Sequence, residues 1–271
     1  MSQPTLRTLT VLADGQEIAS GCHLRLRGTE DLSLRPAFFI LEIEALSSSS
    51  AACLSGARTL RVLRGASTLA EGEIDDVVTS LRSGIPWTTV AFAAGLSFWR
   101  SSVSLSLPAG LRLSDTLRLL LGAAGRGRTD PAFSLAALIG PDPVFSRPQA
   151  FYGRTAELLL ALAAGASISL SGSLPSSPGI YRTPAGIVYD GGTETPVPSL
   201  TLTESHLLSA PEPTADGLLL HTEMAGWPIG ASLRYAAYGQ SGTGRILSRS
   251  IDADQASGPW LSSLLLSSAR S

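Results

Sequence analysis

The feature that most constrains this chain is a succession of short runs in which apolar and polar residues alternate. Alternation places every second side chain on the same face of a strand, so these runs predict β-strands buried on one face. The clearest run covers residues 36–47, with Glu42 and Glu44 on its polar face. Its apolar face is formed by Phe39, Leu41, Ile43 and Ala45.

The first strands are expected to form a hairpin. Residues 6–13 alternate, Asp14 and Gly15 follow, and residues 16–28 run back. An Asp-Gly pair between two alternating runs is a strong local signal for a tight hairpin turn. Further strands are predicted on both sides of Gly65 and over 87–92, 98–107, 166–174, 200–208, 218–225, 231–239, 244–254 and 260–268.

Helix signals are fewer than strand signals. Ser114 and Asp115 can cap a helix that ends by Gly125, and Thr155 can cap a second helix that ends at Gly165. Residues 131–143 fit a short helix or a strand, and residues 47–53 fit a loop or the start of a short helix. The sequence therefore predicts a mainly β (α+β) protein with two short helices, built from barrels or sandwiches.

The charge content excludes several functions. The 20 basic residues are all arginine and the net charge is −2, so a Walker A phosphate loop and a Schiff-base lysine are both excluded. No basic stripe suited to a nucleic-acid backbone is found. Only 15% of residues are charged, against roughly a quarter in an average soluble protein. Either the surface is buried against other subunits, or a large core carries a Ser/Thr-rich surface.

No membrane span or disulfide framework is expected. The uncharged stretch over 158–180 contains Gly165 and Pro175, and its strongly apolar part, 158–166, is far shorter than the roughly 20 residues of a span. The N-terminus has no signal-peptide pattern, and the chain is expected to be soluble. Cys22 and Cys53 are expected to be buried free thiols.

Several residue groups are candidates for chemical sites. His206 with Glu204 and His221 with Glu223 could each help to bind a metal, but no third ligand stands at a telling spacing. The acidic cluster Glu71, Glu73, Asp75 and Asp76 could serve glycan cleavage, but a solvated strand face explains it better, because such faces are common and no supporting motif is found.

The remaining candidates are weaker still. Residues 239–243 lack the second glycine of a nucleophile elbow and suit a hairpin turn better. Residues 125–128 suit a flexible loop better than a dinucleotide loop. The arginines of such a loop could lie at a subunit contact. Most of Trp87, Trp99, Trp227 and Trp260 are expected in the core. We therefore predict no catalytic, cofactor or metal site, and expect the protein not to be an enzyme.

The order of segments also carries a resemblance. An apolar-x-Gly-x-Ile phrase at 69–74 is followed by a Trp/Thr strand at 87–91, a Ser-rich strand at 101–107 and a short helix at 114–121. Residues 151–174 then join an aromatic-Gly segment to a helix and a strand. The closing phrases are 217–220, Gly230, 245–251 and 258–266. This order resembles the baseplate-hub proteins at the tail tip of long-tailed phages and related contractile particles.

The resemblance implies two tube-like β-barrel domains, over 1–108 and 109–271, in a trimeric ring. Two barrels from each of three chains give pseudo-sixfold symmetry, which matches a hexameric tail tube and a threefold spike or tip. The implied partners are further copies of the chain, the tail-tube protein, distal-tail and baseplate proteins, the spike or tip protein and the tape-measure protein. DNA would pass only through the lumen, and no membrane is involved.

The implied location is the virion tail tip, after assembly in the host cytoplasm. Two alternatives stay open from the sequence. One is a hexameric tail-tube or distal-tail ring protein, which shares the barrel. The other is a tail-borne glycan-binding or glycan-cleaving β module that uses an exposed Trp and the cluster at 71–76.

Overall fold

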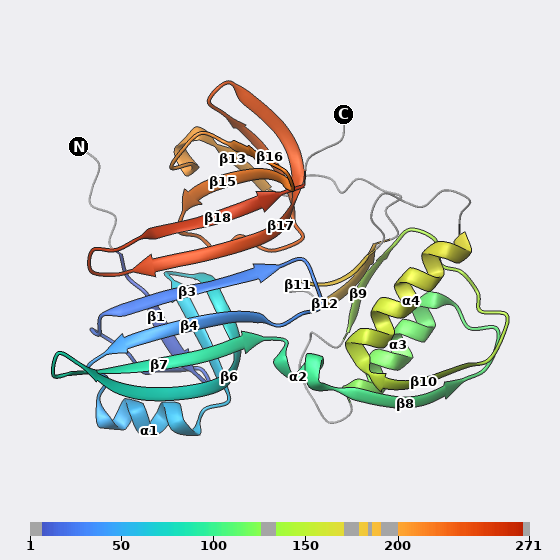
Figure 1. Cartoon of the computed structure of the whole chain (residues 1–271), viewed down its shortest axis with the longest axis horizontal. Helices are drawn as coiled ribbons and strands as arrows, with labels where there is room; N and C mark the ends of the chain where they lie inside the picture. Colours follow the sequence, from blue (N-terminus) through green and yellow to red (C-terminus); the bar gives the residue numbers. More distant parts are fainter. Residues whose placement is uncertain (1–6, 126–133, 171–178, 184–185, 191–199, 268–271) are drawn as a thin grey trace. The chain divides into compact units, whose positions relative to one another are not determined.

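The computed structural model describes residues 7–125, 134–170, 179–183, 186–190 and 200–267 (Figure 1). The chain divides into two compact units that interleave along the sequence. Unit 1 comprises Met1–Asp31, Pro36–Ala94 and Pro198–Ser271, and unit 2 comprises Leu32–Arg35 and Gly95–Val197. The two barrel domains expected over 1–108 and 109–271 stay a prediction.

Unit 1 is built on one 13-stranded sheet in the order β14-β15-β18-β17-β3-β4-β7-β6-β5-β1-β2, with β16 beside β17 and β13 beside β16. Its N-terminal elements are β1 (Thr10–Ala13), β2 (Gln16–Glu17), β3 (Leu24–Asp31), β4 (Ala37–Glu44), α1 (Ser48–Gly56), β5 (Thr59–Arg64), β6 (Ser67–Arg82) and β7 (Ile85–Ala94). Its C-terminal elements are β13 (Leu200–Thr203), the 3-10 turn η2 (Glu204–His206), β14 (Glu212–Thr214), β15 (Gly217–Glu223), β16 (Ser232–Ala237), β17 (Gln240–Asp254) and β18 (Trp260–Leu266). The sheet joins the two ends of the chain, because β17 pairs antiparallel with β3.

Three hairpins of this sheet turn on a residue pair with left-handed backbone at both positions. Asp14 and Gly15 have φ of 46° and 85°, which confirms the predicted first turn. The returning strand β2 is only two residues long, and residues 24–28 lie in β3, which pairs with β4 and β17 instead. The pair Ser83-Gly84 (51° and 81°) joins β6 to β7, and Tyr238-Gly239 (52° and 73°) joins β16 to β17. Positive φ at both central residues matches the right-handed twist of the flanking strands, so these turns set the strand register.

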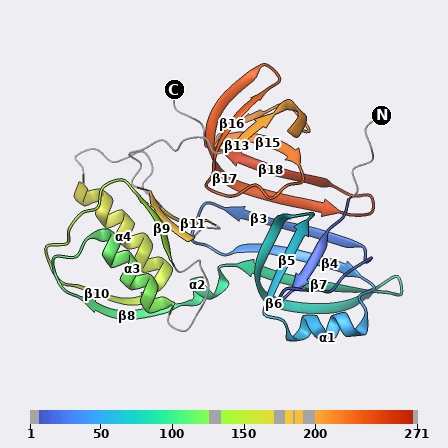
Figure 2. The ribbon, with the colours of Figure 1, turned by 180° about the vertical axis from the view of Figure 1, so that it is seen from behind.

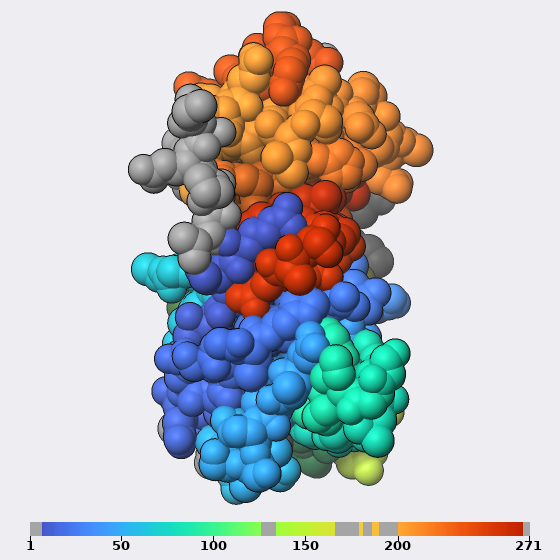
Figure 3. All heavy atoms as spheres, turned by 90° about the vertical axis from the view of Figure 1, so that its left-hand side faces the viewer, coloured from blue at the N-terminus to red at the C-terminus, as the bar shows by residue number. Residues whose placement is uncertain are grey.

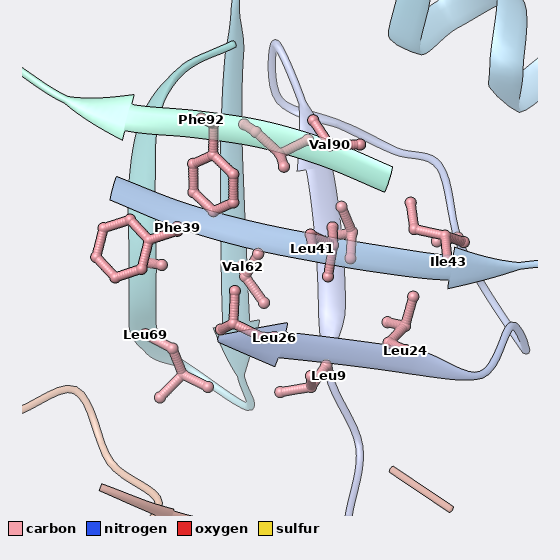
Figure 4. Close-up of a cluster of buried hydrophobic side chains, with 14 of the residues drawn as sticks. Leu9, Leu24, Leu26, Phe39, Leu41, Ile43, Val62, Leu69, Val90 and Phe92 are labelled. Carbon is pink, nitrogen blue, oxygen red and sulfur yellow. The ribbon is translucent and has the colours of Figure 1, made fainter. Parts of the chain in front are cut away.

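The core of unit 1 lies on the concave side of the curved sheet (Figure 4). Phe39, Leu41 and Ile43 of β4 are buried in it, as the alternation over 36–47 predicted. They pack with Leu24 and Leu26 of β3 and with the labelled side chains Val62, Leu69, Val90 and Phe92. Ala45 departs from the predicted pattern, because its φ of 52° takes it out of the strand.

Within its described residues, unit 2 contains three helices and two small sheets (Figure 2). Its elements are α2 (Leu96–Arg100), β8 (Ser102–Leu107), α3 (Leu113–Ala124), β9 (Leu135–Ile139), β10 (Gln149–Arg154), α4 (Thr155–Leu170), β11 (Gly179–Thr183) and β12 (Gly186–Asp190). Strand β10 pairs with β8, and β12 lies between β11 and β9. Helices α3 and α4 lie side by side and contact both sheets, and Leu117 and Leu159 are fully buried between them.

The mainly β class is confirmed, and three details of the prediction are corrected. The structure has α1 and α2 in addition to the two predicted helices. Helix α1 forms because Ser47 caps it, accepting from the Ser50 backbone N–H at 3.1 Å. Helix α2 replaces the first part of the strand expected over 98–107, because Gly95 (φ 75°) starts it and Ser101 Oγ donates to the Phe98 carbonyl.

The third correction concerns α4, which continues through Gly165 to Leu170 where a strand was expected from residue 166. A single helical glycine costs only about 1 kcal/mol relative to alanine, so it does not have to end a helix. The rest of that expected strand, 171–174, lies outside the described residues. Residues 131–143, left open by the sequence, include β9.

No sheet closes on itself within the described part of the chain, so strand pairing does not complete the predicted tube-like barrels. The sheet of unit 1 curves around its core (Figure 1) but ends at β14 and at the two-residue strand β2. Strand β2 forms only the pairs with Leu12 and Ala13, and it does not reach a further strand. A strand at the edge of an open sheet leaves backbone donors and acceptors available for pairing.

Candidate assembly surface

The sheet of unit 1 has a second face, opposite the core, which we call the outer face. Strands β4 and β7 place the pairs Phe38–Ala93, Ile40–Ala91, Glu42–Thr89 and Glu44–Trp87 on it. Phe38 and Ile40 are 51% and 47% exposed, and we call these two side chains the apolar patch. Exposed large aromatic and aliphatic side chains on one strand are a feature of interaction sites.

The other end of the outer face carries a network of ion pairs. Arg82 Nη2 donates to Glu42 Oε1 at 2.6 Å, and Arg27 Nη2 lies 3.4 Å from Glu42 Oε2. The hydrogen bond from Arg82 lowers the pKa of Glu42, against the opposing effect of burial. The indole of Trp87 lies between two guanidinium groups, with Arg25 and Arg82 at 5.2 and 5.3 Å from its ring centre. This end is therefore electrostatically satisfied within the chain.

His23 extends this network to the C-terminal strands. Its ring nitrogens lie 2.8 Å from Glu44 Oε2 and 2.8 Å from Asp254 Oδ1, and Arg25 Nε lies 2.8 Å from Asp254 Oδ2. Burial acts to lower the pKa of His23, but the hydrogen bonds to Asp254 and Glu44 raise it above its ordinary value. Burial acts to raise the pKa of Asp254, yet the His23 bond and the Ala256 N–H hold it at about 2.

Strands β6 and β7 continue beyond the end of β4 as a two-stranded hairpin (Figure 1), which we call the arm, residues 81–86. Figure 3 shows its atoms in blue-green at the surface, beside the strands in blue. Leu81 and Ile85 of the arm are 75% and 41% exposed, and Val78 of the adjoining part of β6 is 52% exposed. The arm therefore presents two large apolar side chains to solvent.

The acidic cluster does not form the single carboxylate face that alternation predicted. A β-bulge between Ile74 and Asp76 inserts Asp75 as an extra residue, so the spacing of two breaks there. Glu71 is paired with Arg61 Nη2 at 2.6 Å on the exposed surface. The cluster is therefore a solvated stretch of β6, inside the sheet, with its charges dispersed.

The histidine–glutamate pairs do not assemble metal sites. His206 Nδ1 lies 2.9 Å from the Thr203 hydroxyl at the start of η2. His221 Nδ1 lies 2.9 Å from Ser263 Oγ, and its other ring nitrogen is 4.0 Å from Glu212 rather than near Glu223. Among the described residues no group of three or more His, Cys, Asp or Glu side chains could hold a metal ion.

The remaining candidates from the sequence are the segments 239–243 and 125–128 and the two cysteines. Ser241 lies in β17 opposite Ala236, beside the Tyr238-Gly239 turn, so residues 239–243 form a hairpin as expected. Residues 126–128 lie outside the described residues. Cys22 and Cys53 are free and half-buried, and burial raises the pKa of Cys22.

The tryptophans contribute mainly to packing. Trp87 is buried, while Trp260 packs against the core of unit 1 and Trp99 against that of unit 2. Trp227 is half-buried and donates its indole N–H to Thr222 Oγ1 at 2.9 Å. In the part of the chain that the structure describes, no helix is both long and apolar enough to span a bilayer.

The sequence predictions missed the apolar patch and the arm. Phe38 and Ile40 alternate with Phe39 and Leu41 along the strand. The apolar run 38–41 is therefore the sequence signal for a strand with apolar side chains on both faces. The sequence signal for the turn of the arm is the Ser83-Gly84 pair, because Ser-Gly pairs between strand-like segments are typical of turns.

No family model matches the chain, and no curated protein matches its sequence. Solved structures do match. A tail protein from Neisseria meningitidis MC58 superposes with a TM-score of 0.65 at 12% identity, covering 96% of this chain and 95% of that protein. The 43 kDa tail protein of prophage MuSo2 from Shewanella oneidensis gives 0.62 at 12% identity, covering 97% of each chain.

A third match is the E. coli c3393 protein, a component of the type VI secretion system described as structurally similar to the T4 bacteriophage tail proteins gp27 and gp5. Its TM-score is 0.58 at 13% identity, covering 97% of this chain and 77% of that one. The chain therefore has the fold of phage and prophage tail proteins along nearly its whole length.

Proposed function

We propose that this chain is a structural protein of a phage tail or related injection particle, where it forms a trimeric baseplate hub. The hub would join a hexameric tail tube to a threefold spike or tip. The observation that carries the proposal is the fold shared with two tail proteins over 96–97% of this chain and 95–97% of theirs. A likeness that spans both chains end to end supports one common architecture rather than a shared module.

The surface of unit 1 supports an assembly role. Phe38, Ile40 and Leu81 are about half or more exposed, and only 15% of the residues are charged. Assembly interfaces are depleted in charged residues at their centres and enriched in aromatic ones. Burying these side chains between subunits would stabilise a ring, because each Å² of apolar surface removed from water contributes roughly 25 cal/mol.

The proposal assigns no catalysis to the chain. The described residues contain no metal-binding group, and the carboxylates at 71–76 are dispersed by the β-bulge at Asp75. The two units of the chain, each present three times, would supply the sixfold match to the tail tube. The partners would be the tail-tube, distal-tail, spike or tip and tape-measure proteins, with DNA passing through the lumen.

Electron cryo-microscopy of a particle that contains the chain tests this function. The proposal expects three copies in one ring at the end of the tail tube. Six copies in a ring would overturn the hub in favour of a tail-tube or distal-tail protein. A chain that is absent from the particle, stays monomeric and releases sugar from bacterial cell walls would overturn the structural role altogether.

A further inference from the structure

We propose that unit 2 of one copy docks on the C-terminal strands of unit 1 of the next copy, and that opposite charges stabilise this contact. The inference rests on the proposed ring assembly and names the surfaces that close it. The occupant of each surface is a second copy of this chain. On unit 1 the surface is the outer face of β14, β15, β18 and β17, which we call the acidic face.

The two units carry net charges of opposite sign. Unit 1 contains 16 Asp and Glu residues and 11 Arg residues, whereas unit 2 contains 6 and 9. Unit 1 therefore has a surplus of five negative charges, and unit 2 has a surplus of three positive charges. Contact between units of the same kind would bring like charges together, whereas contact between unit 1 and unit 2 brings opposite charges together.

The acidic face combines leucines with carboxylates. Cross-strand pairing places Leu261 between Glu223 and Asp252, and it places Glu212 beside Leu219. These positions alternate along their strands with the buried residues of the inner face, so their side chains lie on the solvent side of the sheet. Apolar side chains with polar groups around them are the usual arrangement of a protein interface.

Ion pairs within the chain do not neutralise this face. Arg27 stands opposite Asp252 on β3, but its guanidinium lies 3.4 Å from Glu42 Oε2. Among the described residues, no ion pair includes Glu223 or Asp252. The two carboxylates are therefore available to a cation from outside the chain.

Unit 2 presents a cation and an apolar side chain from one short segment. The ion pairs among its described residues use three other arginines, Arg112, Arg118 and Arg154. Arg147 is exposed and takes part in none of these pairs. Val144, three residues earlier, is 57% exposed. The segment 144–147 therefore matches the leucines and carboxylates of the acidic face in both polarity and charge.

The two surfaces also meet the geometric requirement of a ring. A closed ring of three joins copies through two different surfaces, while contact between identical surfaces gives only pairs. The acidic face belongs to unit 1 and the segment 144–147 belongs to unit 2, so one contact of this kind repeats around the ring.

Light scattering on full-length charge-reversal variants tests the contact. Glu223→Arg and Arg147→Glu should each weaken self-association by about tenfold or more at low salt, because each turns an attraction into a repulsion. The double variant should recover most of the wild-type association, since its charges are exchanged rather than lost. Arg234→Glu makes the same change of charge at an exposed position of unit 1 on β16, so it is the matched control and should not weaken association.

Two milder variants guard against misfolding. Glu223→Gln and Arg147→Gln remove one charge each and should weaken association less than the reversals do. Far-ultraviolet circular dichroism of every variant should match the wild type.

Salt gives an independent test. Raising NaCl from about 0.05 to about 0.5 M shortens the screening length from roughly 14 Å to roughly 4 Å, so the wild type should associate more weakly. An association that salt does not change, or a double variant no better associated than the single reversals, overturns the charge contact. A wild-type chain that is monomeric at every concentration in low salt instead overturns the ring itself, which separates the two failures.

Discussion

His23 Nε2 lies 2.8 Å from Asp254 Oδ1, although 231 positions separate the two residues in the sequence. The bond ties the start of β3 to the end of β17, the strands through which the N-terminal and C-terminal parts of unit 1 share one sheet. Glu44 and Arg25 complete the contact on either side. The pairing of the N-terminal and C-terminal strands therefore includes a histidine whose pKa is raised above its ordinary value.

Stability should depend on pH through this contact. The pKa of His23 is raised by folding, so its contribution is complete below the unfolded value near 6.5 and is lost as the pH rises through the folded value. The pKa of Asp254 falls from 3.8 to about 2, so its contribution is present above 3.8 and is lost as the pH falls through 2. The contact should be strongest between about pH 4 and 6.5.

Urea unfolding of the wild type and His23→Ala, measured from pH 4 to 9, checks this dependence. The difference in unfolding free energy should be largest between pH 4 and 6.5 and should shrink by pH 9. His206→Ala, which removes a half-buried histidine bonded to the Thr203 hydroxyl rather than to a carboxylate, is the control. A difference that stays constant across the range would refute the coupling of His23 to Asp254.

The buried arginine of β17 should matter far more than an exposed one. Arg249 is 6% exposed, and its guanidinium donates to Glu30 Oε2 at 2.9 Å and to the Leu69 carbonyl at 2.8 Å. Arg249→Ala would leave Glu30 without this partner, at a cost of about 3–5 kcal/mol. Arg61→Ala, which breaks the exposed pair with Glu71, should cost no more than about 1 kcal/mol. Equal losses for the two variants in urea unfolding would contradict this account.

Close packing against Gly72 should also limit substitution. A Cβ atom at this position would lie 2.4 Å from the carbonyl carbon of Ala93, a backbone atom that cannot rotate away. Gly72→Ala should therefore destabilise unit 1 by about 1–3 kcal/mol. Gly56→Ala is the matched control, because nothing lies within 4 Å of its Cβ position, and it should leave stability unchanged or raise it. Thermal unfolding followed by circular dichroism measures both, and a neutral Gly72→Ala would show that the strands can separate.

Local patterns predicted most strands, and the long-range features escaped them. The alternation of Phe39, Leu41 and Ile43 identifies β4 and its buried face, and Asp14-Gly15 identifies the first turn, because these signals depend on neighbours in sequence. The predicted end of α4 was wrong, because the cost of one helical glycine, Gly165, is too small to end a helix.

The candidate surface was less predictable for a physical reason. The pairing of β17 with β3, and with it the contact between His23 and Asp254, joins segments more than 200 residues apart, which no local pattern encodes. The exposure of Phe38 and Leu81 depends on where β4 stops and where β6 and β7 continue. Such differences in strand length become visible only when the register of the whole sheet is known.

The molar mass of the purified full chain in solution tests the central claim most directly. Light scattering coupled to size-exclusion chromatography should give about 84 kDa, three times the 28.1 kDa of one chain. A mass that stays at 28.1 kDa at every concentration, or one that is six times that value, would contradict the trimeric hub.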